Sequence, residues 1–347
     1  MATFNGNKRN NLITGTADPD GIDGRGGNDI LEGLGGIDFI FGNTGNDLIE
    51  GGADADNLDG FTGIDTLSYA SSPAGVTIVL GADGATTFAG GGDAAGDVCF
   101  AFENITGSAF DDNLTGNDFA NVLKGGAGGD NLEGGAGKDI LKGGDGDDEM
   151  TGGIGADILD GGAGSDLVIY AASTVGVRIT LGANGAETIG KGGEAQGDRI
   201  SKVEDVFGSN FNDILIGNNR ANDLFGRGGN DVLKGGGGDD MLFGDAGDGG
   251  DDTLIGGRGS DFLKGNNGDD IFVFGPGFGH DTIDDFVGGL GLSDVIRIDK
   301  DVFKNFAQVT AASSDDGTNV VIVKGSNTLT LLNVNLTDLN ADDFSFF

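Results

Sequence analysis

The chain has 347 residues, of which 73 are glycine, and its 57 acidic and 19 basic side chains leave a net charge of −38. Average proteins contain about 7% glycine, and each glycine disfavours a helix by roughly 1 kcal/mol relative to alanine, so the composition excludes an ordinary helical protein. The charge argues against a nucleic-acid binder, because phosphate contacts need clustered lysine and arginine. The length leaves room for two or three domains.

The N-terminal residues and the cysteine content bear on the cellular compartment. Cys99 is the only cysteine, so no intramolecular disulfide can form. The N-terminal stretch up to Gly15 contains Lys8 and Arg9 but no apolar run, so we expect no cleaved secretory signal peptide. No apolar run approaches the ~18 residues of a membrane helix, so we expect no transmembrane segment. These features predict either a cytosolic protein or export by a route that needs no signal peptide.

A nine-residue repeat occupies three runs of seven units, residues 6–68, 107–169 and 208–273, and one unit of the last run carries three extra residues. Position one is glycine and position eight is apolar in all 21 units, and position six is aspartate in 18 of them. The other three units have asparagine at position six: Asn11, Asn121 and Asn222. A frame this strict indicates an architecture of stacked repeats.

Two 38-residue segments, 69–106 and 170–207, separate the runs, which begin 101 residues apart. Each segment carries an alternating stretch, 76–80 or 177–181, that predicts a half-buried strand. Each segment then returns to the nine-residue frame. We therefore predict that both are expanded coils of one continuous structure and not separate domains.

The composition of one unit predicts its local structure. Positions one to five are rich in glycine, aspartate and asparagine, which tolerate the positive φ angles of tight turns. Positions seven to nine predict a three-residue strand whose position-eight side chain points to one side. So short a strand buries its apolar residue only when units stack, which predicts a narrow solenoid. Because turns alternate with strands, two units make one full coil, and every second unit stacks directly above the last.

Stacking places the position-six carboxylates about 4.8 Å apart, where like charges repel. The turns also present backbone carbonyls, so carboxylates and carbonyls together form an all-oxygen cage that suits Ca²⁺. Mg²⁺ prefers a stricter octahedron with retained water, and zinc would want histidine or cysteine, of which the chain has one each. The candidate metal ligands are the position-six aspartates: Asp20, Asp29, Asp38, Asp47, Asp56, Asp65, Asp112, Asp130, Asp139, Asp148, Asp157, Asp166, Asp213, Asp231, Asp240, Asp252, Asp261 and Asp270.

The units that begin at Gly134 and Gly152 match the pattern G-G-x-G-x-D-x-U-x, in which U is apolar. The chain therefore resembles the RTX (hemolysin-type) calcium-binding repeat proteins over about residues 6–273. The resemblance implies an all-β fold, a parallel β-roll (β-solenoid) that binds Ca²⁺ between successive turns. The alternative, a glycine-rich disordered linker, does not explain an apolar residue at every position eight.

The number of calcium sites has a ceiling. Seven units contain five pairs of stacked neighbours, so three runs offer at most about 15 sites for Ca²⁺. The first two units of each run lack glycine at position four and look like degenerate lead-in turns, which lowers that number. Because the aspartates repel one another without metal, we expect folding to be coupled to Ca²⁺ binding.

The nine-residue frame stops after Val273, and we predict that residues 274–347 form a C-terminal β cap over the open end of the roll. The alternating stretches 294–298, 319–323 and 328–332 predict strands.

Residues 274–286 and the ending 342–347 resemble the C-terminal region of RTX proteins that leave bacteria by type I secretion. The resemblance implies an uncleaved C-terminal export signal, the type I secretion apparatus as a partner, and a secreted, extracellular protein. A buried phenylalanine strand that ends the cap is the alternative explanation, and both can hold.

The sequence offers little for catalysis. His280 is the only histidine, in a glycine-rich turn where we expect a solvated or capping role, and no serine lies in a nucleophile elbow. Cys99 occupies a position-eight slot and is predicted to be a buried, inert thiol. Tyr69 and Tyr170 begin the two expanded coils and are predicted to anchor them, with sugar stacking as the alternative. The repeats start at residue 6 and leave no room for a preceding catalytic domain, so we expect no enzyme.

We therefore expect a secreted calcium-binding protein that folds on extracellular Ca²⁺ and acts at a surface or on a host without catalysis. The alternative is a calcium-dependent polysaccharide-binding module, similar to those of alginate epimerases, that contacts extracellular polysaccharide through its expanded coils. A pore-forming toxin is a third class, against which the lack of any long hydrophobic helix argues.

Overall fold

The computed structural model describes residues 1–82, 86–245, 249–289 and 294–347, and the chain divides into two compact units, Met1–Val168 and Ile169–Phe347. Each unit consists mainly of short strands stacked in parallel. No helix within the described residues is long and apolar enough to cross a membrane. The all-β parallel roll predicted from the repeats is confirmed.

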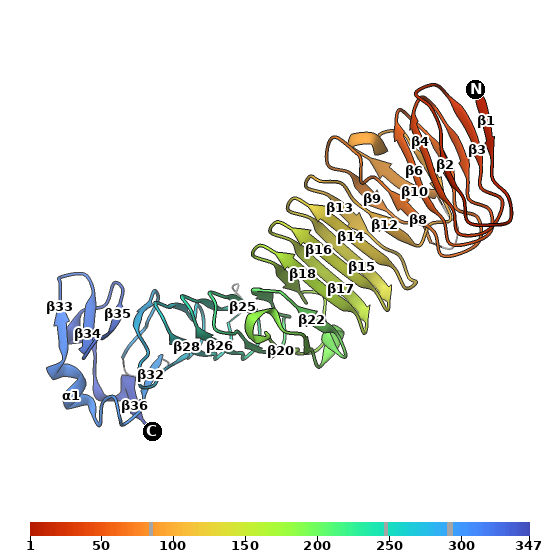
Figure 1. Cartoon of the computed structure of the whole chain (residues 1–347). Coiled ribbons are helices and arrows are strands. Elements are labelled where there is room, and N and C mark those ends of the chain that lie inside the picture. The colour runs from red at the N-terminus through yellow and green to blue at the C-terminus, as the bar shows by residue number, and fades with distance from the viewer. Residues whose placement is uncertain (83–85, 246–248, 290–293) are drawn as a thin grey trace. The chain divides into compact units, whose positions relative to one another are not determined.

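In the first unit, positions seven to nine of each repeat form a strand, and successive repeats place their strands on alternate sides of the roll (Figure 1). One side holds β1 (Ala2–Asn5), β3 (Asp20–Asp23), β5 (Phe39–Phe41), β7 (Asn57–Asp59), β11 (Val98–Phe100), β9 (Thr77–Val79), β13 (Asn113–Thr115), β15 (Asn131–Gly137), β17 (Glu149–Gly155) and β19 (Leu167–Ile169). The other side holds β2 (Leu12–Thr14), β4 (Ile30–Gly35), β6 (Leu48–Ala53), β8 (Thr66–Ser68), β12 (Asn104–Thr106), β14 (Val122–Ala127), β16 (Ile140–Asp145) and β18 (Ile158–Ala163).

The register within the runs confirms the predicted coil of two repeats. Asn131 of β15 pairs with Glu149 of β17, and Ile140 of β16 pairs with Ile158 of β18, so the offset equals two repeats on both sides. The position-eight side chains therefore stack between the two sheets. Leu132 and Leu141, for example, are 0% exposed, and this single file of apolar side chains is the core of the roll.

The expanded coil 69–106 joins the stack through parallel pairs. β12 pairs with β8 of the preceding run and with β14 of the following run. β11 pairs with β7, and β9 pairs with β13. The extra residues of the coil form β10 (Thr86–Gly90), which is antiparallel to both β9 and β11, and the short 3₁₀ helix η1 (Gly92–Ala94).

The second unit repeats this plan. One side holds β23 (Asp205–Phe207), β25 (Asp223–Arg227), β27 (Met241–Asp245), β29 (Phe262–Lys264), β31 (His280–Ile283) and β35 (Asn327–Leu331). The other side holds β20 (Arg178–Thr180), β24 (Ile214–Ile216), β26 (Val232–Gly237), β28 (Thr253–Arg258), β30 (Ile271–Phe274), β32 (Val295–Ile298) and β36 (Phe344–Phe346). Its expanded coil adds η2 (Ala183–Gly185), η3 (Gly193–Ala195) and an antiparallel pair, β21 (Thr188–Ile189) with β22 (Arg199–Ser201).

Parallel stacking continues beyond residue 273. β31 pairs with β29 and β35 on one side, and β32 pairs with β30 and β36 on the other. The remaining elements are α1 (Phe306–Ala311), the antiparallel strands β33 (Ser313–Asp315) and β34 (Val320–Lys324), η4 (Leu336–Asp338) and η5 (Ala341–Asp343). The strands expected at 294–298, 319–323 and 328–332 are confirmed as β32, β34 and β35.

Position two of the regular turns has a positive φ, which glycine adopts without strain. Gly126 (φ 127°) and Gly135 (φ 102°) are examples. Some repeats place a larger side chain there, such as Leu34 (φ 79°) and Phe61 (φ 65°), both about half exposed. Those two residues hold a conformation that costs free energy, and they gain little burial in return.

Truncation of a core leucine tests the single-file core. Leu132 lies between Leu114 and Met150 in the stack, so Leu132→Ala leaves a cavity and should lower the free energy of unfolding by about 2–5 kcal/mol. Ile154, which is 69% exposed, supplies the control, since Ile154→Ala should change the free energy of unfolding by no more than about 0.5 kcal/mol. Urea unfolding in calcium-containing buffer measures both. Equal effects of the two substitutions would contradict a core made of position-eight residues.

Candidate metal centre

The position-six carboxylates hold successive coils together. Oδ1 of each regular aspartate accepts a hydrogen bond from the backbone N–H of the position-six residue one coil earlier. The nitrogen–oxygen distance is 2.7 Å from Asp29 to Asp47 and 2.8 Å from Asp130 to Asp148. In the unit with three extra residues, the bond from Asp231 to Asp252 keeps the same geometry at 2.8 Å. The structure thus brings the predicted ligands into stacked rows, as their spacing implies.

The second carboxylate oxygen of these aspartates is buried and differs from the first. Within the described residues, Oδ2 has no hydrogen-bond donor in Asp29, Asp38, Asp47, Asp56, Asp65, Asp130, Asp139, Asp148, Asp231, Asp240, Asp252 and Asp261. A buried charged oxygen without a partner costs several kcal/mol, unless a proton or a cation compensates it. The row of oxygens therefore needs a positive charge inside the roll.

The glycine at position one shows what else surrounds these oxygens. A Cβ atom on Gly24 would lie 2.6 Å from Asp29 Oδ2 and 3.0 Å from the Gly42 carbonyl oxygen of the next coil. A Cβ atom on Gly134 would lie 2.7 Å from Asp139 Oδ2 and 2.6 Å from the carbonyl oxygen of the corresponding glycine one coil later. Carboxylate and carbonyl oxygens thus converge beside a glycine without a side chain.

This donor set fits calcium. Ca²⁺ binds six to eight oxygen ligands in flexible geometry, from carboxylates and backbone carbonyls. The described residues contain no group of three histidine, cysteine, aspartate or glutamate side chains placed to hold a metal, so each cradle relies on backbone oxygens for part of its ligand set. A hard cation that accepts carbonyl oxygens suits such a cradle, whereas zinc, which prefers nitrogen and sulfur, does not.

Three of the predicted ligands have a different environment. In Asp20, Oδ2 accepts from the backbone N–H of Thr16 at 2.7 Å and from the Thr16 hydroxyl at 2.8 Å. Asp112 and Asp213 accept from both the backbone N–H and the hydroxyl of a serine four residues earlier, Ser108 and Ser209. These three aspartates lie in lead-in turns, where the protein's own donors occupy both carboxylate oxygens.

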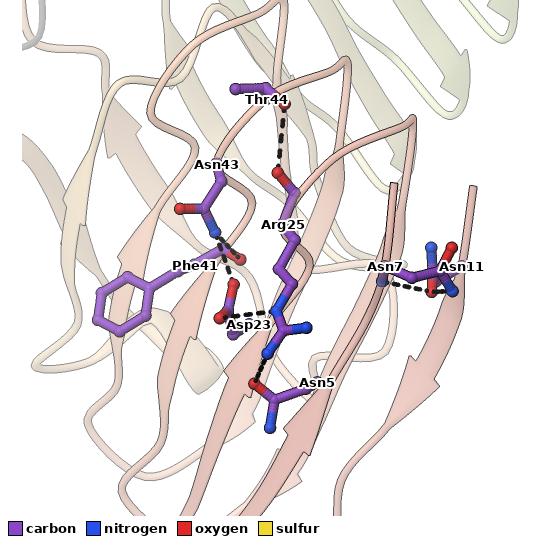
Figure 2. Close-up of polar contacts among 8 residues, drawn as sticks. All are labelled: Asn5, Asn7, Asn11, Asp23, Arg25, Phe41, Asn43 and Thr44. Atoms are coloured by element: carbon purple, nitrogen blue, oxygen red, sulfur yellow. Dashed lines mark hydrogen bonds and ion pairs between the residues drawn. The ribbon is translucent and has the colours of Figure 1, made fainter. Parts of the chain in front are cut away.

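The asparagine units also satisfy themselves. Asn121 Oδ1 accepts from the backbone N–H of Asn117 at 2.8 Å, and Asn121 Nδ2 donates to the Glu103 carbonyl at 2.7 Å. Asn11 likewise accepts from the Asn7 side chain at 2.8 Å (Figure 2). A neutral amide carries no charge that a cation must offset. The lead-in turns therefore differ from the regular turns in chemistry as well as in sequence.

The expanded coils supply two more position-six carboxylates, Asp97 and Asp198, which are not among the candidate ligands predicted from the sequence. Asp97 Oδ1 accepts from the Asp56 N–H at 2.8 Å, and Asp97 Oδ2 accepts from the buried Tyr69 hydroxyl at 2.9 Å. The Tyr170 hydroxyl donates to Asp198 Oδ2 at 3.0 Å in the same way. Both tyrosines are 1% exposed, which confirms that they anchor the coils and leaves no ring face for a sugar.

The position-six row has further members that the nine-residue frame does not reveal. Glu103 Oε2 accepts from the Asp65 N–H at 2.7 Å in place of an aspartate. Asp281 and Asp294 accept from the N–H groups of Asp261 and Asp270 at 3.1 and 3.0 Å. Asp281 Oδ2 is buried with no donor in the described chain, so it belongs with the regular sites. The run Asp281-Thr-Ile283 has the aspartate and apolar spacing of a repeat, which was the available signal.

Two other residues singled out in the sequence have the expected surroundings. Cys99 is 0% exposed, and burial raises the pKa of its thiol to about 12, so the thiol is neutral at physiological pH. His280 is exposed on β31, with Nδ1 2.9 Å from the Thr328 hydroxyl of β35.

Burial, assisted by neighbouring carboxylates, raises the pKa of the regular aspartates. The pKa is about 7 for Asp130 and about 8 for Asp231 and Asp252. At neutral pH, a metal-free roll therefore either holds protons on these groups or buries uncompensated charge.

The raised pKa values predict that acid favours the metal-free roll. The folded state binds protons that the unfolded state lacks between the ordinary aspartate value of 3.8 and about 8, so stability is full below this window and falls as pH rises through it. In chelator, strand content measured by far-UV circular dichroism should be higher at about pH 5.5 than at about pH 8. A higher strand signal at the more basic pH would contradict this account of the buried carboxylates.

Comparison with known proteins agrees with this geometry. The sequence matches the model of the RTX calcium-binding nonapeptide repeat (4 copies) over residues 5–40, 32–67, 106–141, 133–168, 207–242, 216–249 and 246–283. No curated protein matches the chain. Among solved structures, it is similar to the extracellular lipase LipA from Serratia marcescens at 19% identity and a TM-score of 0.25, covering 67% of this chain and 39% of the lipase chain. Because the repeat model matches more than half of its residues, the chain belongs to the family of RTX calcium-binding nonapeptide repeat proteins.

Proposed function

We propose that this calcium-binding β-roll protein works outside the cell, folds when it meets extracellular Ca²⁺, and acts by binding rather than by catalysis. The observation that carries the proposal is the row of buried Oδ2 atoms without donors, several of which, such as those of Asp29 and Asp139, lie beside a carbonyl oxygen of the next coil. Extracellular calcium modules bind at about 10⁻⁴ to 10⁻³ M, so such a roll stays metal-free in the cytosol and loads outside. Binding free energy then becomes folding free energy.

The regular position-six aspartates are the proposed ligands, each acting through Oδ2 together with carbonyl oxygens of the adjacent turns. They are Asp29, Asp38, Asp47, Asp56, Asp65, Asp130, Asp139, Asp148, Asp157, Asp166, Asp231, Asp240, Asp252, Asp261 and Asp270, with Asp281 added from the C-terminal segment. We exclude Asp20, Asp112 and Asp213 from the ligands, because hydrogen bonds from the protein already occupy both of their carboxylate oxygens. Their exclusion removes the stacked pairs Asp20–Asp38, Asp112–Asp130 and Asp213–Asp231 from the ceiling of about 15 sites.

Export by a type I secretion system is part of the proposal. The chain belongs to a repeat family typical of that route, and its ending carries acidic residues followed by Phe344, Phe346 and Phe347. Phe344 and Phe346 also lie in β36, which pairs with β32 of the roll. The same residues therefore serve the folded protein after export and remain accessible while the chain is unfolded.

Binding of an acidic polysaccharide through Ca²⁺ at the expanded coils is a second candidate function with less support. The position-six carboxylates of those coils, Asp97 and Asp198, are buried and receive the hydroxyls of Tyr69 and Tyr170. Neither carboxylate is exposed to bridge a cation to a polymer.

A pair of matched substitutions tests the ligand assignment. Asp130→Asn removes a charged oxygen from a regular site and should lower the bound calcium by about one ion per chain, because a neutral amide is a weaker ligand. Asp112→Asn alters a lead-in turn one coil away and should leave the count unchanged. Equilibrium dialysis with elemental analysis measures both. If Asp112→Asn loses as much calcium as Asp130→Asn, the distinction between the two kinds of turn is wrong.

The export proposal predicts that a type I secretion host releases the full chain but retains a chain that ends at residue 273. A fusion of residues 274–347 to an unrelated slow-folding protein should be released, which separates an export signal from a folding requirement. Immunoblots of medium and cells, with a cytosolic marker to exclude lysis, measure release. Equal release of the truncated and full chains would disprove the localisation.

A further inference from the structure

A pocket of about 340 Å³ lies on the outer face of the first unit, apart from the buried carboxylate row. Asn5, Asp23 and Phe41 form one wall, aligned side by side on β1, β3 and β5. Asn43 and Phe61 form the other wall, at position two of turns that lie one coil apart. The volume falls within the roughly 300–1,000 Å³ of small-molecule sites.

The polar side chains around the pocket are held in place by hydrogen bonds, and their charges balance (Figure 2). Asp23 accepts from Asn43 Nδ2 at 2.9 Å and forms an ion pair with Arg25 at 3.4 Å. Arg25 in turn donates to Asn5 Oδ1 at 2.9 Å. Within the described residues, no group accepts from Asn5 Nδ2 and none donates to Asn43 Oδ1. The pocket therefore presents one free donor, Asn5 Nδ2, and one free acceptor, Asn43 Oδ1. The paired Asp23 carboxylate and Arg25 guanidinium hold both in place.

Phe61 lines the pocket at a backbone conformation that costs free energy. Phe61 has a φ of 65° at a turn position where Gly52 and Gly126 occupy the equivalent site, and its ring is 49% exposed. The ring meets Phe41 edge to face, with centroids 5.9 Å apart and planes at 67°. A bulky residue at positive φ costs roughly 1–3 kcal/mol, and strain of this kind gathers at binding sites. Glycine would avoid that cost. Leu34 bears the same strain elsewhere, so the place of the Phe61 ring in the pocket beside Phe41, and not the strain alone, indicates a use for its face.

We propose that this pocket binds a neutral saccharide ring. An exposed aromatic ring accepts the apolar C–H face of a sugar, while the fixed Asn5 donor and Asn43 acceptor suit its hydroxyls. A free anion finds the Arg25 guanidinium already paired with Asp23, and a free cation finds the Asp23 carboxylate already paired with Arg25. The inference rests on the proposed function, because the two walls meet only when the roll has folded on calcium.

Three glycine substitutions allow a test on the calcium-loaded full chain. Phe61→Gly removes the exposed ring and Asn43→Gly removes the free acceptor. Both positions have a positive φ, where glycine is unstrained, so both variants should fold. Leu34→Gly is the control, since Leu34 has the same turn position and a φ of 79° but belongs to β4 on the other side of the roll. The probes are neutral tetrasaccharides of glucose, galactose, mannose or rhamnose, and a tetra-uronate of equal length.

Saturation-transfer NMR should show binding of at least one neutral probe to the wild type and to Leu34→Gly. Phe61→Gly should weaken that binding about tenfold, the size of one good aromatic contact, and Asn43→Gly should weaken it as well. A wild type that folds on calcium but binds no neutral probe overturns the saccharide site and leaves the calcium proposal intact. Undiminished binding by Phe61→Gly, or equal binding of the uronate, also overturns it. Failure of the wild type to fold on calcium refutes the proposed function instead.

Discussion

The buried carboxylate at position six is the interaction on which the roll depends. One of its oxygens accepts a backbone N–H from the coil before it, as Asp47 does from Asp29, and so fixes the spacing of the coils. Its other oxygen lies inside the roll beside a carbonyl oxygen, with no donor. The position-six side chain therefore joins successive coils through one oxygen and destabilises the stack through the uncompensated charge of the other. A bound cation compensates that charge and so stabilises the stack. The net charge of −38 is that of the chain before it binds cations.

At the ends of the repeat runs, hydrogen bonds from the protein take the place of a cation at the position-six carboxylates. At their beginnings, a serine or threonine at position two donates twice to the carboxylate, as Thr16 does to Asp20. After the first two runs, a buried tyrosine hydroxyl donates one hydrogen bond to Oδ2 of Asp97 or Asp198. Protein donors thus close the metal-binding rows where the stack changes from repeats to expanded coils.

Much of this arrangement is predictable from the repeat itself. Glycine at position one, an apolar residue at position eight and the nine-residue spacing together imply coils of two repeats, a single-file core and stacked carboxylates, and the observed register agrees. The exceptions depend on contacts that no fixed spacing encodes. Glu103 enters the row from within an expanded coil, and Asp281 enters it beyond the last full repeat. The carboxylate of Asp112 is occupied because Ser108, at position two of a lead-in turn, donates to both of its oxygens.

The central claim is that calcium completes the roll, and far-UV circular dichroism of the full chain tests it most directly. At about pH 7.5 in chelator, the spectrum should be that of a largely unfolded chain, and Ca²⁺ added to about 10 mM should produce a cooperative β spectrum. The same concentration of Mg²⁺ should produce much less change, since Mg²⁺ tolerates the cradle's oxygen geometry poorly. An equal β spectrum in chelator and in calcium would contradict the account.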